Sequence, residues 1–209
     1  MMKRLLFLFA VVLVLTGCQK DREKDTTSLI PDDGLKRTFI AKSEDEFIKP
    51  IHLRRNVILY LRNSELQLLN YVLEEEKVIF DDVNDFVFFH DDTGEGAARK
   101  TVYYIGLEKK SGDIEVYQLQ FRPSKIEGHE AYDFFFISIE GEETTTDVTL
   151  FESESIELLR EGNYSTLDEL IALSENFEVT QNIAINPGYL EVLKDDEGIN
   201  HVFYVFENE

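Results

Sequence analysis

The chain of 209 residues holds a single cysteine, Cys18, so no intrachain disulfide can form and the stability of the fold must come from its core. A zinc site made of several thiolates is excluded for the same reason. The sequence also lacks G-x-S-x-G, S-x-x-K and a phosphate-binding glycine loop. These absences argue against the common hydrolases and nucleotide enzymes, and we expect no enzymatic activity and no cofactor.

Basic residues are scarce: 21 Lys and Arg stand against 42 Asp and Glu, for a net charge of −21. The imbalance lies mainly in the last part of the chain, where residues 127–209 hold 21 acids and only two bases, Arg160 and Lys194. Such a field repels nucleic acid and anionic lipid and speeds the encounter with cationic partners. The alternative interpretation is that the acidity serves only to keep the protein soluble.

No apolar run reaches the length of about twenty residues that a membrane-spanning helix needs. The longest run, Leu5–Leu15, has eleven residues, follows Lys3 and Arg4, and stops at Leu15-Thr16-Gly17-Cys18. This N-terminus resembles the signal peptide and lipobox of bacterial lipoproteins, in which an aliphatic residue, a small residue or Thr, and Gly or Ala precede the lipidated cysteine. The alternatives are an uncleaved anchor and an ordinary secretory signal.

The resemblance implies cleavage before Cys18, transfer of diacylglycerol to its thiol and, in many bacteria, acylation of the freed amine with a fatty acid such as palmitate, which also excludes a catalytic role for that thiol. We therefore expect a signal peptide over residues 1–17, a lipidated N-terminus and polar tether over 18–34, and one acidic domain over 35–209. The tether would span about 20–25 Å. The protein would sit on the extracytoplasmic side of the cell membrane, or of the outer membrane in an organism that has one.

The remaining pattern predicts an α+β fold with a mainly antiparallel sheet and three or four short helices. The tripeptide Lys110-Ser111-Gly112 lies between two segments in which apolar and polar residues alternate. This pattern predicts a hairpin of residues 100–109 and 113–122 with one solvent-exposed face. Further strands are expected at 35–40, 56–62, 77–80, 85–90 and 177–185. Residues 132–140 and 147–151 are expected to form a second pair, and residues 188–194 and 199–206 a last hairpin with its turn at 195–198. Capping patterns predict helices that start near Ser43, Ser64, Ser153 and Thr166, the second of them reaching about Glu76.

Candidate metal ligands are few, and we predict no metal site. None of His52, His90, His129 and His201 has a partner at metal-ligand spacing, and His201 is expected to be a hydrogen-bonded core or edge residue. Glu127, His129 and Glu130 fit an exposed loop better than a metal site. Residues 91–96 resemble the first half of a calcium loop, but Val102 stands where a bidentate glutamate is required.

Two aromatic segments, Phe134–Ile137 and Val202–Phe206, are apolar at successive positions. Burial of both faces in the core is one explanation. An exposed aromatic stripe that receives a peptide or a lipid is the other.

The leading functional hypothesis is a binding module that captures a protein partner, with a basic partner favoured by charge. Its overall plan of anchor, tether and acidic strand-rich domain is similar to that of membrane-anchored immunity proteins against type VII secreted toxins, in layout but not in any diagnostic motif. The alternatives are a structural or assembly lipoprotein of the envelope and a small-molecule-binding or hydrolytic lipoprotein. The acidic residues expected to face the partner are Glu140, Glu142, Glu143, Asp147, Glu152 and Glu154.

Overall fold

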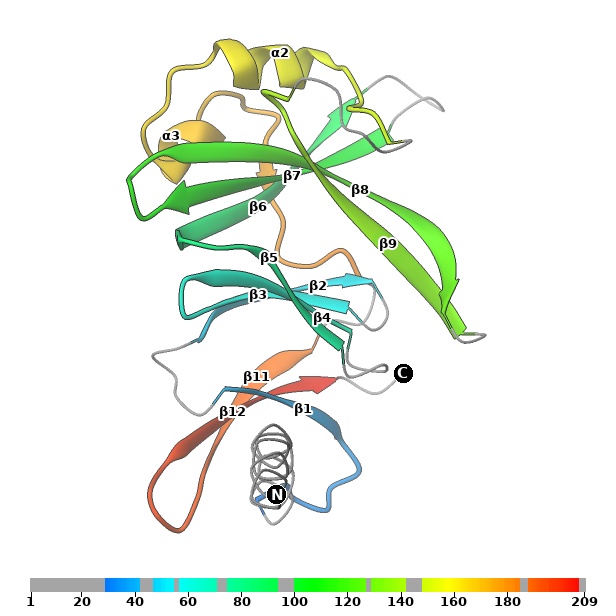
Figure 1. The fold of residues 1–209 in the computed structure, drawn as a ribbon, viewed down its shortest axis with the longest axis vertical. Helices are drawn as coiled ribbons and strands as arrows, with labels where there is room; N and C mark the ends of the chain where they lie inside the picture. The colour runs from blue at the N-terminus through cyan, green and yellow to red at the C-terminus, as the bar shows by residue number, and fades with distance from the viewer. Residues whose placement is uncertain are drawn as a thin grey trace, which may run out of the picture. The chain divides into compact units, whose positions relative to one another are not determined.

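The computed structural model describes residues 29–41, 47–54, 57–70, 75–93, 100–126, 129–141, 148–184 and 188–206 (Figure 1). The signal peptide and the lipobox predicted for residues 1–18 lie outside these ranges. The chain divides into two compact units, one of Met1–Asp45 with Gly188–Glu209 and one of Glu46–Pro187. The prediction of one domain over residues 35–209 stays a prediction.

The first unit contains a three-stranded antiparallel sheet in the order β1-β12-β11. Its strands are β1 (Lys36–Ala41), β11 (Tyr189–Lys194) and β12 (Asn200–Phe206). The turn between β11 and β12 closes with hydrogen bonds between Asp195 and Ile199, and Gly198 adopts the positive φ of 85° that favours glycine there. The predicted N-terminal strand and C-terminal hairpin are therefore confirmed. Residues 202–205 are all buried, as core burial of this segment requires.

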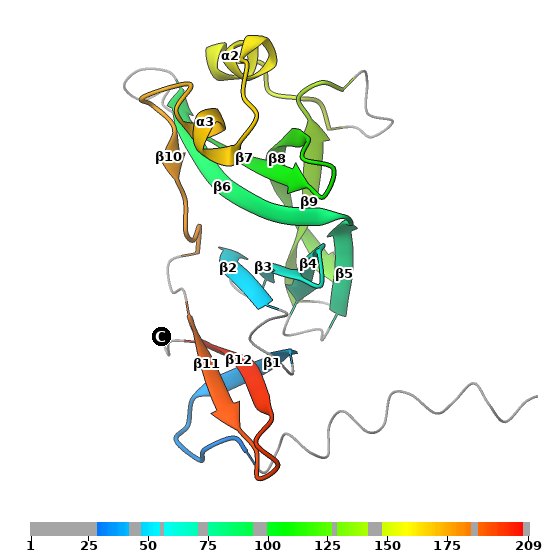
Figure 2. The same cartoon turned by 90° about the vertical axis from the view of Figure 1, so that its left-hand side faces the viewer.

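The second unit contains two antiparallel sheets and two short helices within the described residues (Figure 2). The four-stranded sheet has the order β2-β3-β4-β5, from β2 (Phe47–Arg54), β3 (Val57–Arg62), β4 (Glu65–Asn70) and β5 (Glu75–Phe80). The five-stranded sheet has the order β10-β6-β7-β8-β9, from β6 (Val83–Thr93), β7 (Lys100–Lys109), β8 (Ile114–Ile126), β9 (His129–Ser138) and β10 (Glu178–Val179). The helices are α2 (Glu154–Glu161) and α3 (Leu167–Ile171).

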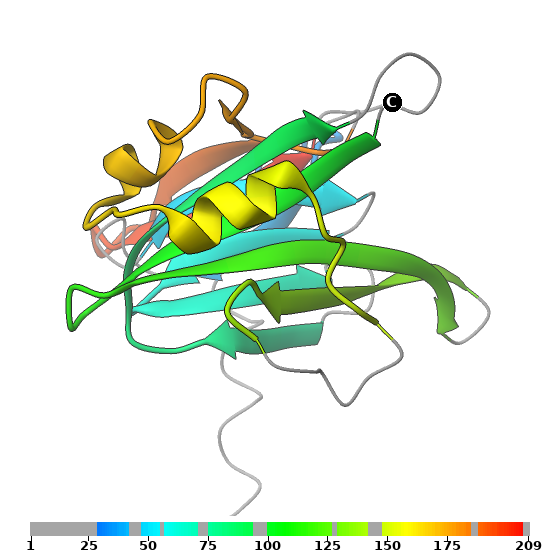
Figure 3. The same ribbon diagram turned by 90° about the horizontal axis from the view of Figure 1, so that it is seen from above.

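The five-stranded sheet is covered on both faces. One face packs against the four-stranded sheet, where Phe86, Phe88 and Leu107 share a core with Leu59 and Leu61. The other face lies under the two helices (Figure 3), and this second core is formed by Phe89, Val102, Tyr104, Val116, Ile139, Ile156, Leu159, Leu170 and Phe177. The layers of this unit are thus helices, five-stranded sheet and four-stranded sheet.

This layering contradicts the prediction of a hairpin with one solvent-exposed face. Gln118 of β8 is 0% exposed, and its side chain donates to the carbonyl of Phe151 at 3.0 Å and accepts from the amide of Phe151 at 2.8 Å. Gln120 likewise donates to the carbonyl of Thr149 at 2.8 Å. The polar face of β8 therefore serves to bind the segment before α2, and polar side chains at these positions do not mark a surface.

The helix predicted from Ser64 to about Glu76 is wrong, because the described residues that follow Ser64 in this range, 65–70 and 75–76, belong to β4 and β5. Asn63 and Ser64 have φ values of 52° and 62°, and Arg62 pairs directly with Glu65. Positive φ at both central residues is the geometry of a type I′ turn, which matches the twist of a two-residue hairpin. Ser64 is thus a turn residue, and the leucines that follow it pack on the equally apolar strand β3.

Three other expectations need correction. The helix predicted at Ser43 does not continue into Phe47 and Ile48, which start β2, while residues 42–46 lie outside the described ranges. β9 pairs with β8, with Phe121 opposite Phe134, and residues 148–151 form no strand. The strand expected over 177–185 is reduced to the two residues of β10.

The other two helix predictions are confirmed. Ser153 caps α2 by accepting a hydrogen bond from the Ile156 amide, and the amide of Gly162 donates to the carbonyl of Leu158 at the other end. Thr166 caps α3 in the same way, through the Glu169 amide. Two helices are found among the described residues, fewer than the three or four expected.

Candidate functional site

Among the described residues of the second unit, the outer edge of β9 is a sheet edge without a partner strand. β9 pairs with β8 over ten consecutive residues without a bulge, and within the described ranges no strand pairs with its other side. Its sequence, HEAYDFFFIS, contains neither proline nor glycine. An edge of this kind presents a row of backbone donors and acceptors that can pair with another chain.

The other edges of the two sheets carry the usual protection against strand addition. β5 begins with three exposed charged residues, Glu75, Glu76 and Lys77. β2 is covered where the amides of Ile183 and Ala184 donate to the carbonyl of His52, at 2.9 and 3.1 Å. β10 is only two residues long. Charges, coverage and shortness are the devices by which sheet proteins blunt their edges, and the Phe134–Ile137 part of β9 lacks all three.

The aromatic run of β9 is shared between two faces. Phe134 and Phe136 are half-buried against the core between the two sheets, which confirms the core interpretation for these residues and for the buried Ile137. Phe135 faces the other way and is also half-buried, with the guanidinium carbon of Arg122 4.8 Å from its ring centroid. The segment is therefore a partly covered edge rather than a fully exposed stripe.

Arg54 of β2 contacts one aromatic ring on β8 and one on β9, the two strands that form the edge of the five-stranded sheet. Its guanidinium carbon lies 4.3 Å from the ring centroid of Phe121 and 5.5 Å from that of Tyr132. Cation–π contacts of this kind contribute about 0.5–2 kcal/mol each, depending on how far they are shielded from water. β9 is therefore held firmly on β8 up to its exposed edge.

Arg160 of α2 lies at the end of the open edge and binds Glu152, one of the predicted acidic residues. Its Nε donates to the carbonyl of Ile139 at 2.6 Å, and its two terminal nitrogens donate to the carboxylate of Glu152 at 3.0 and 3.2 Å. Glu140 lies next to this junction and is exposed, and Glu154 is exposed in the first turn of α2. From its sequence position Arg160 is notable only as one of two bases in residues 127–209, because its contacts depend on the fold.

The structure therefore brings together Glu140 and Glu152 and places Glu154 on the adjoining helix, while Glu142, Glu143 and Asp147 lie outside the described residues. The charge of Glu152 is partly neutralised by Arg160. Glu154 also has a structural part, because an acid in the first turn of a helix is stabilised by the helix dipole. Burial raises the pKa of Tyr164, and the charge of Glu140 raises it further.

Three of the four histidines have structural surroundings. His129 and Glu130, which were expected in an exposed loop, are instead the first residues of β9, so this prediction is wrong for them. His201 is 2% exposed and its Nε2 lies 2.9 Å from the Asp195 carboxylate, which confirms the expected hydrogen-bonded histidine. His90 Nδ1 lies 2.5 Å from the Thr180 hydroxyl, and His52 is buried in β2. Among the described residues no three His, Cys, Asp or Glu side chains converge as metal ligands would.

The predicted half of a calcium loop does not form a cluster in its described part. Asp91 is buried and its carboxylate accepts a hydrogen bond from the Ser155 hydroxyl. The Asp92 carboxylate accepts from the hydroxyl of Thr101 at 2.6 Å. The two carboxylates are thus bound to different elements, and residues 94–96 lie outside the described ranges.

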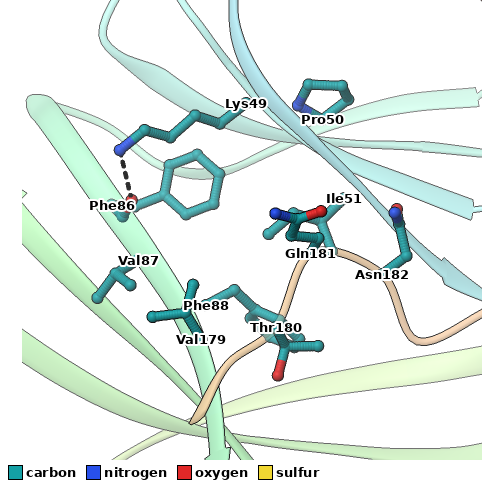
Figure 4. A pocket seen from close by; sticks show the side chains of 10 residues that line it. All are labelled: Lys49, Pro50, Ile51, Phe86, Val87, Phe88, Val179, Thr180, Gln181 and Asn182. Atoms are coloured by element: carbon teal, nitrogen blue, oxygen red, sulfur yellow. Dashed lines mark hydrogen bonds between the residues drawn. The ribbon is translucent and has the colours of Figure 1, made fainter. Parts of the chain in front are cut away.

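A pocket of about 320 Å³ lies within the second unit, between β2, β6 and the segment that follows β10 (Figure 4). The sequence did not indicate it, because the pattern before Pro50 favoured a helix. The residues around it are Lys49, Pro50, Ile51, Phe86, Val87, Phe88, Val179, Thr180, Gln181 and Asn182.

None of the helices in the described ranges is long and apolar enough to cross a membrane. Comparisons of the chain with protein-family models, with curated proteins and with solved structures found no match.

Proposed function

We propose that this chain is a lipid-anchored, extracytoplasmic binding protein that captures a basic protein partner along the open edge of β9. The single observation that carries the proposal is the unprotected apolar edge of β9, next to an acidic junction held by Arg160. The membrane is its other partner, through the lipid on Cys18, and nucleic acid is disfavoured by the negative charge.

The anchor follows from the lipobox at Leu15-Thr16-Gly17-Cys18. Two or three acyl chains on Cys18 would hold the protein at the membrane stably, at about 0.8 kcal/mol for each buried CH₂ group. The polar residues up to Gly34 would let the folded part stand away from the headgroups. Capture would then take place on the outer surface of the cell membrane or at the outer membrane.

The edge of β9 suits capture because an extended segment of a partner can add to it as a further strand. Backbone hydrogen bonds supply affinity in this mode, and the side chains that alternate along the strand supply specificity. Phe134, Phe135 and Phe136 are half-buried, so a strand placed beside them would cover the remaining apolar surface. The ribbon is already held in shape by Arg54 and Arg122, which limits the ordering that binding would require.

The charge of the chain indicates the chemistry of the partner. With a net charge of −21 and an acidic C-terminal part, the protein attracts cationic surfaces over a range of about 8 Å at physiological salt. Glu140, Glu152 and Glu154 lie near the end of β9 and would face basic groups of a bound partner. One specific form of this proposal is an immunity lipoprotein that neutralises a toxin acting at the envelope.

The runner-up is a structural or assembly lipoprotein that uses the same edge to join envelope machinery. Both functions predict a protein partner, so the identity of that partner distinguishes them. A basic toxin supports the first function, and a component of the envelope machinery supports the second.

The proposal is tested by tagging the protein in its own cells, solubilising the membranes and recovering bound proteins at increasing salt. Wild type is compared with Phe135→Lys, which places on β9 the residue that natural edges use against strand addition. The matched control is Val78→Lys, the same kind of change on edge strand β5, where Val78 is 46% exposed.

We expect wild type and Val78→Lys to recover one basic protein in equal amount, released as salt rises, and Phe135→Lys to recover much less of it. Undiminished recovery with Phe135→Lys contradicts the role of the edge. Binding that is indifferent to salt contradicts the role of the acidic surface, and the absence of any protein partner contradicts the proposed function as a whole.

A further inference from the structure

The pocket beside β2 owes its existence to the segment of residues 178–184, which crosses from one sheet of the second unit to the other. At its start, the Thr180 amide donates to the carbonyl of Phe88 on β6 at 2.7 Å. At its end, the amide of Ile183 donates to the carbonyl of His52 on β2 at 2.9 Å. Because both ends are bound to strands, the residues between them form a fixed wall rather than a loose loop.

Most of the pocket surface is apolar. Ile51, Phe86 and Phe88 form its inner part and belong to the core between the sheets. Val179 stands at the rim and is 58% exposed, the highest value among the exposed large hydrophobic side chains of the described residues. The volume of about 320 Å³ is at the lower end of the range for small-molecule sites.

Among the described residues around the pocket, Lys49 is the only charged one, and its charge is already paired. Its ammonium donates to both carboxylate oxygens of Asp85, at 2.6 and 2.9 Å. It also donates to the carbonyl of Phe86 at 3.2 Å (Figure 4). An ammonium group has three donors, so these three contacts use all of them. The pocket therefore offers neither a free donor on Lys49 nor a net positive charge to an anion.

The backbone at Lys49 is also unusual. Lys49 has a φ of 53°, in the left-handed region, at the place where the pairing of β2 with β3 shifts register. Residues other than glycine adopt this conformation at a cost of about 1 kcal/mol or more, and such positions cluster at binding sites. The register shift at Lys49 directs the lysine side chain to Asp85 and leaves the pocket open beside this side chain.

Two primary amides supply the polar groups of the pocket. The Asn182 side-chain oxygen accepts a hydrogen bond from the His52 amide at 2.9 Å, which orients its NH₂ group away from that contact. Gln181 makes no side-chain hydrogen bond with the part of the chain that the structure describes, and Figure 4 shows its amide between Lys49 and Asn182. A carboxamide both donates and accepts, so it can form a pair of hydrogen bonds with an uncharged group that does the same.

We propose that this pocket binds a small uncharged molecule, with an apolar body against Ile51 and Val179 and a carboxamide or hydroxyl group paired with Gln181 and Asn182. This site is separate from the edge of β9, and it gives the protein a small-molecule ligand in addition to the proposed protein partner. Binding of the ligand would also hold the segment of residues 178–184 in place.

The test compares three probes of nearly equal size and different charge: benzamide, benzoate and benzylamine, which is protonated at pH 7. Each is titrated into the full mature lipoprotein in detergent, and the methyl resonances of Ile51, Val87 and Val179 are followed by NMR. We expect saturable shifts with benzamide and at least tenfold weaker binding of the two ions. Absence of saturable shifts with benzamide, or equal binding of benzoate, overturns the proposal.

Two variants locate the binding. Gln181→Ala should weaken benzamide by about threefold to tenfold, the contribution of one hydrogen bond. Val179→Trp should block the rim and abolish the shift at Ile51, whereas Val192→Trp, the same change at an exposed position of β11, should leave it intact. Unchanged binding in Val179→Trp, with the fold intact by circular dichroism, places the probe elsewhere and also overturns the proposal.

Discussion

Ser155, in the first turn of α2, donates a hydrogen bond from its hydroxyl to the carboxylate of Asp91, a residue of β6 that is 5% exposed. The pair places a buried carboxyl group beside the N-terminus of a helix, whose first amides have no partner within the helix. It also fixes α2 on the five-stranded sheet. Since Arg160 of α2 reaches the end of β9, the geometry of the proposed binding edge depends on this internal contact.

Replacing Asp91 should therefore destabilise the second unit. Asp91→Ala leaves the Ser155 hydroxyl without its partner in a buried place, and we expect the free energy of unfolding to fall by about 1–3 kcal/mol in urea titrations. Asp81→Ala, an exposed acid in the turn before β6, is the matched control and should change it by less than about 0.5 kcal/mol. Equal effects of the two variants would contradict a structural role for the buried carboxylate.

Gly106 of β7 is required by the close approach of α3. A Cβ at this position would lie 2.4 Å from Leu170 Cδ2 and 3.3 Å from Val87 Cγ1. Gly106→Ala should lower stability by about 1–3 kcal/mol through overpacking, although alanine suits a strand better than glycine.

A double-mutant cycle with Leu170 separates this explanation from a backbone effect. Leu170→Ala alone should cost about 2–5 kcal/mol, because it leaves a cavity beneath the helix. In the double variant the new methyl group occupies part of that cavity. The double variant should therefore lose less free energy of unfolding than the sum of the losses in the two single variants. Strict additivity would show that the clash with Leu170 is not the cause.

The hairpin of β11 and β12 should be sensitive to acid through Asp195. Hydrogen bonds from His201 and then from the amides of Ile199 and Glu197 lower the pKa of this carboxyl below its usual value of 3.8. A lowered pKa in the folded state stabilises the fold at pH values above 3.8, and this contribution is lost as the pH falls through the lower folded-state pKa. Asp195→Asn should therefore be less stable than wild type at pH 7 and should approach it near pH 2. Parallel curves in urea titrations across this range would contradict the argument.

The anchor is tested by Cys18→Ala in the native host. We expect wild type to incorporate an alkyne-labelled palmitate analogue and the variant not to, because Cys18 is the only cysteine of the chain and lipidation starts at its thiol. Labelling of the variant, or a mature N-terminus other than residue 18 in wild type, would contradict the lipoprotein assignment.

Local signals in the sequence predicted the parts of the fold that depend on local physics. Ser153, Gly162 and Thr166 marked the ends of α2 and the start of α3, because caps act on the nearest backbone groups. Gly112 and Gly198 marked two hairpin turns for the same reason. The helix predicted at Ser64 was wrong although the capping pattern was the same. There the turn Asn63-Ser64 and the pairing of β4 with β3 overrode the local capping preference.

The features that position the candidate sites depend on contacts between distant residues and could not be read from local patterns. The burial of Gln118 follows from its contact with Phe151, 33 residues away. The open edge of β9 exists because its predicted partner, the segment of residues 148–151, lies over a face of the sheet instead. The pocket follows from a crossing segment that was predicted to be a continuous strand.

Capture of a partner on the edge of β9 can be detected by photo-crosslinking in living cells. The photoreactive amino acid p-benzoylphenylalanine replaces Phe135 in one strain and Val78 of β5 in another, and the adducts are compared after illumination. If the partner binds along the edge of β9, we expect one discrete adduct with a basic protein at position 135 and none with that protein at position 78. No adduct at position 135, or the same adduct at both positions, would contradict it.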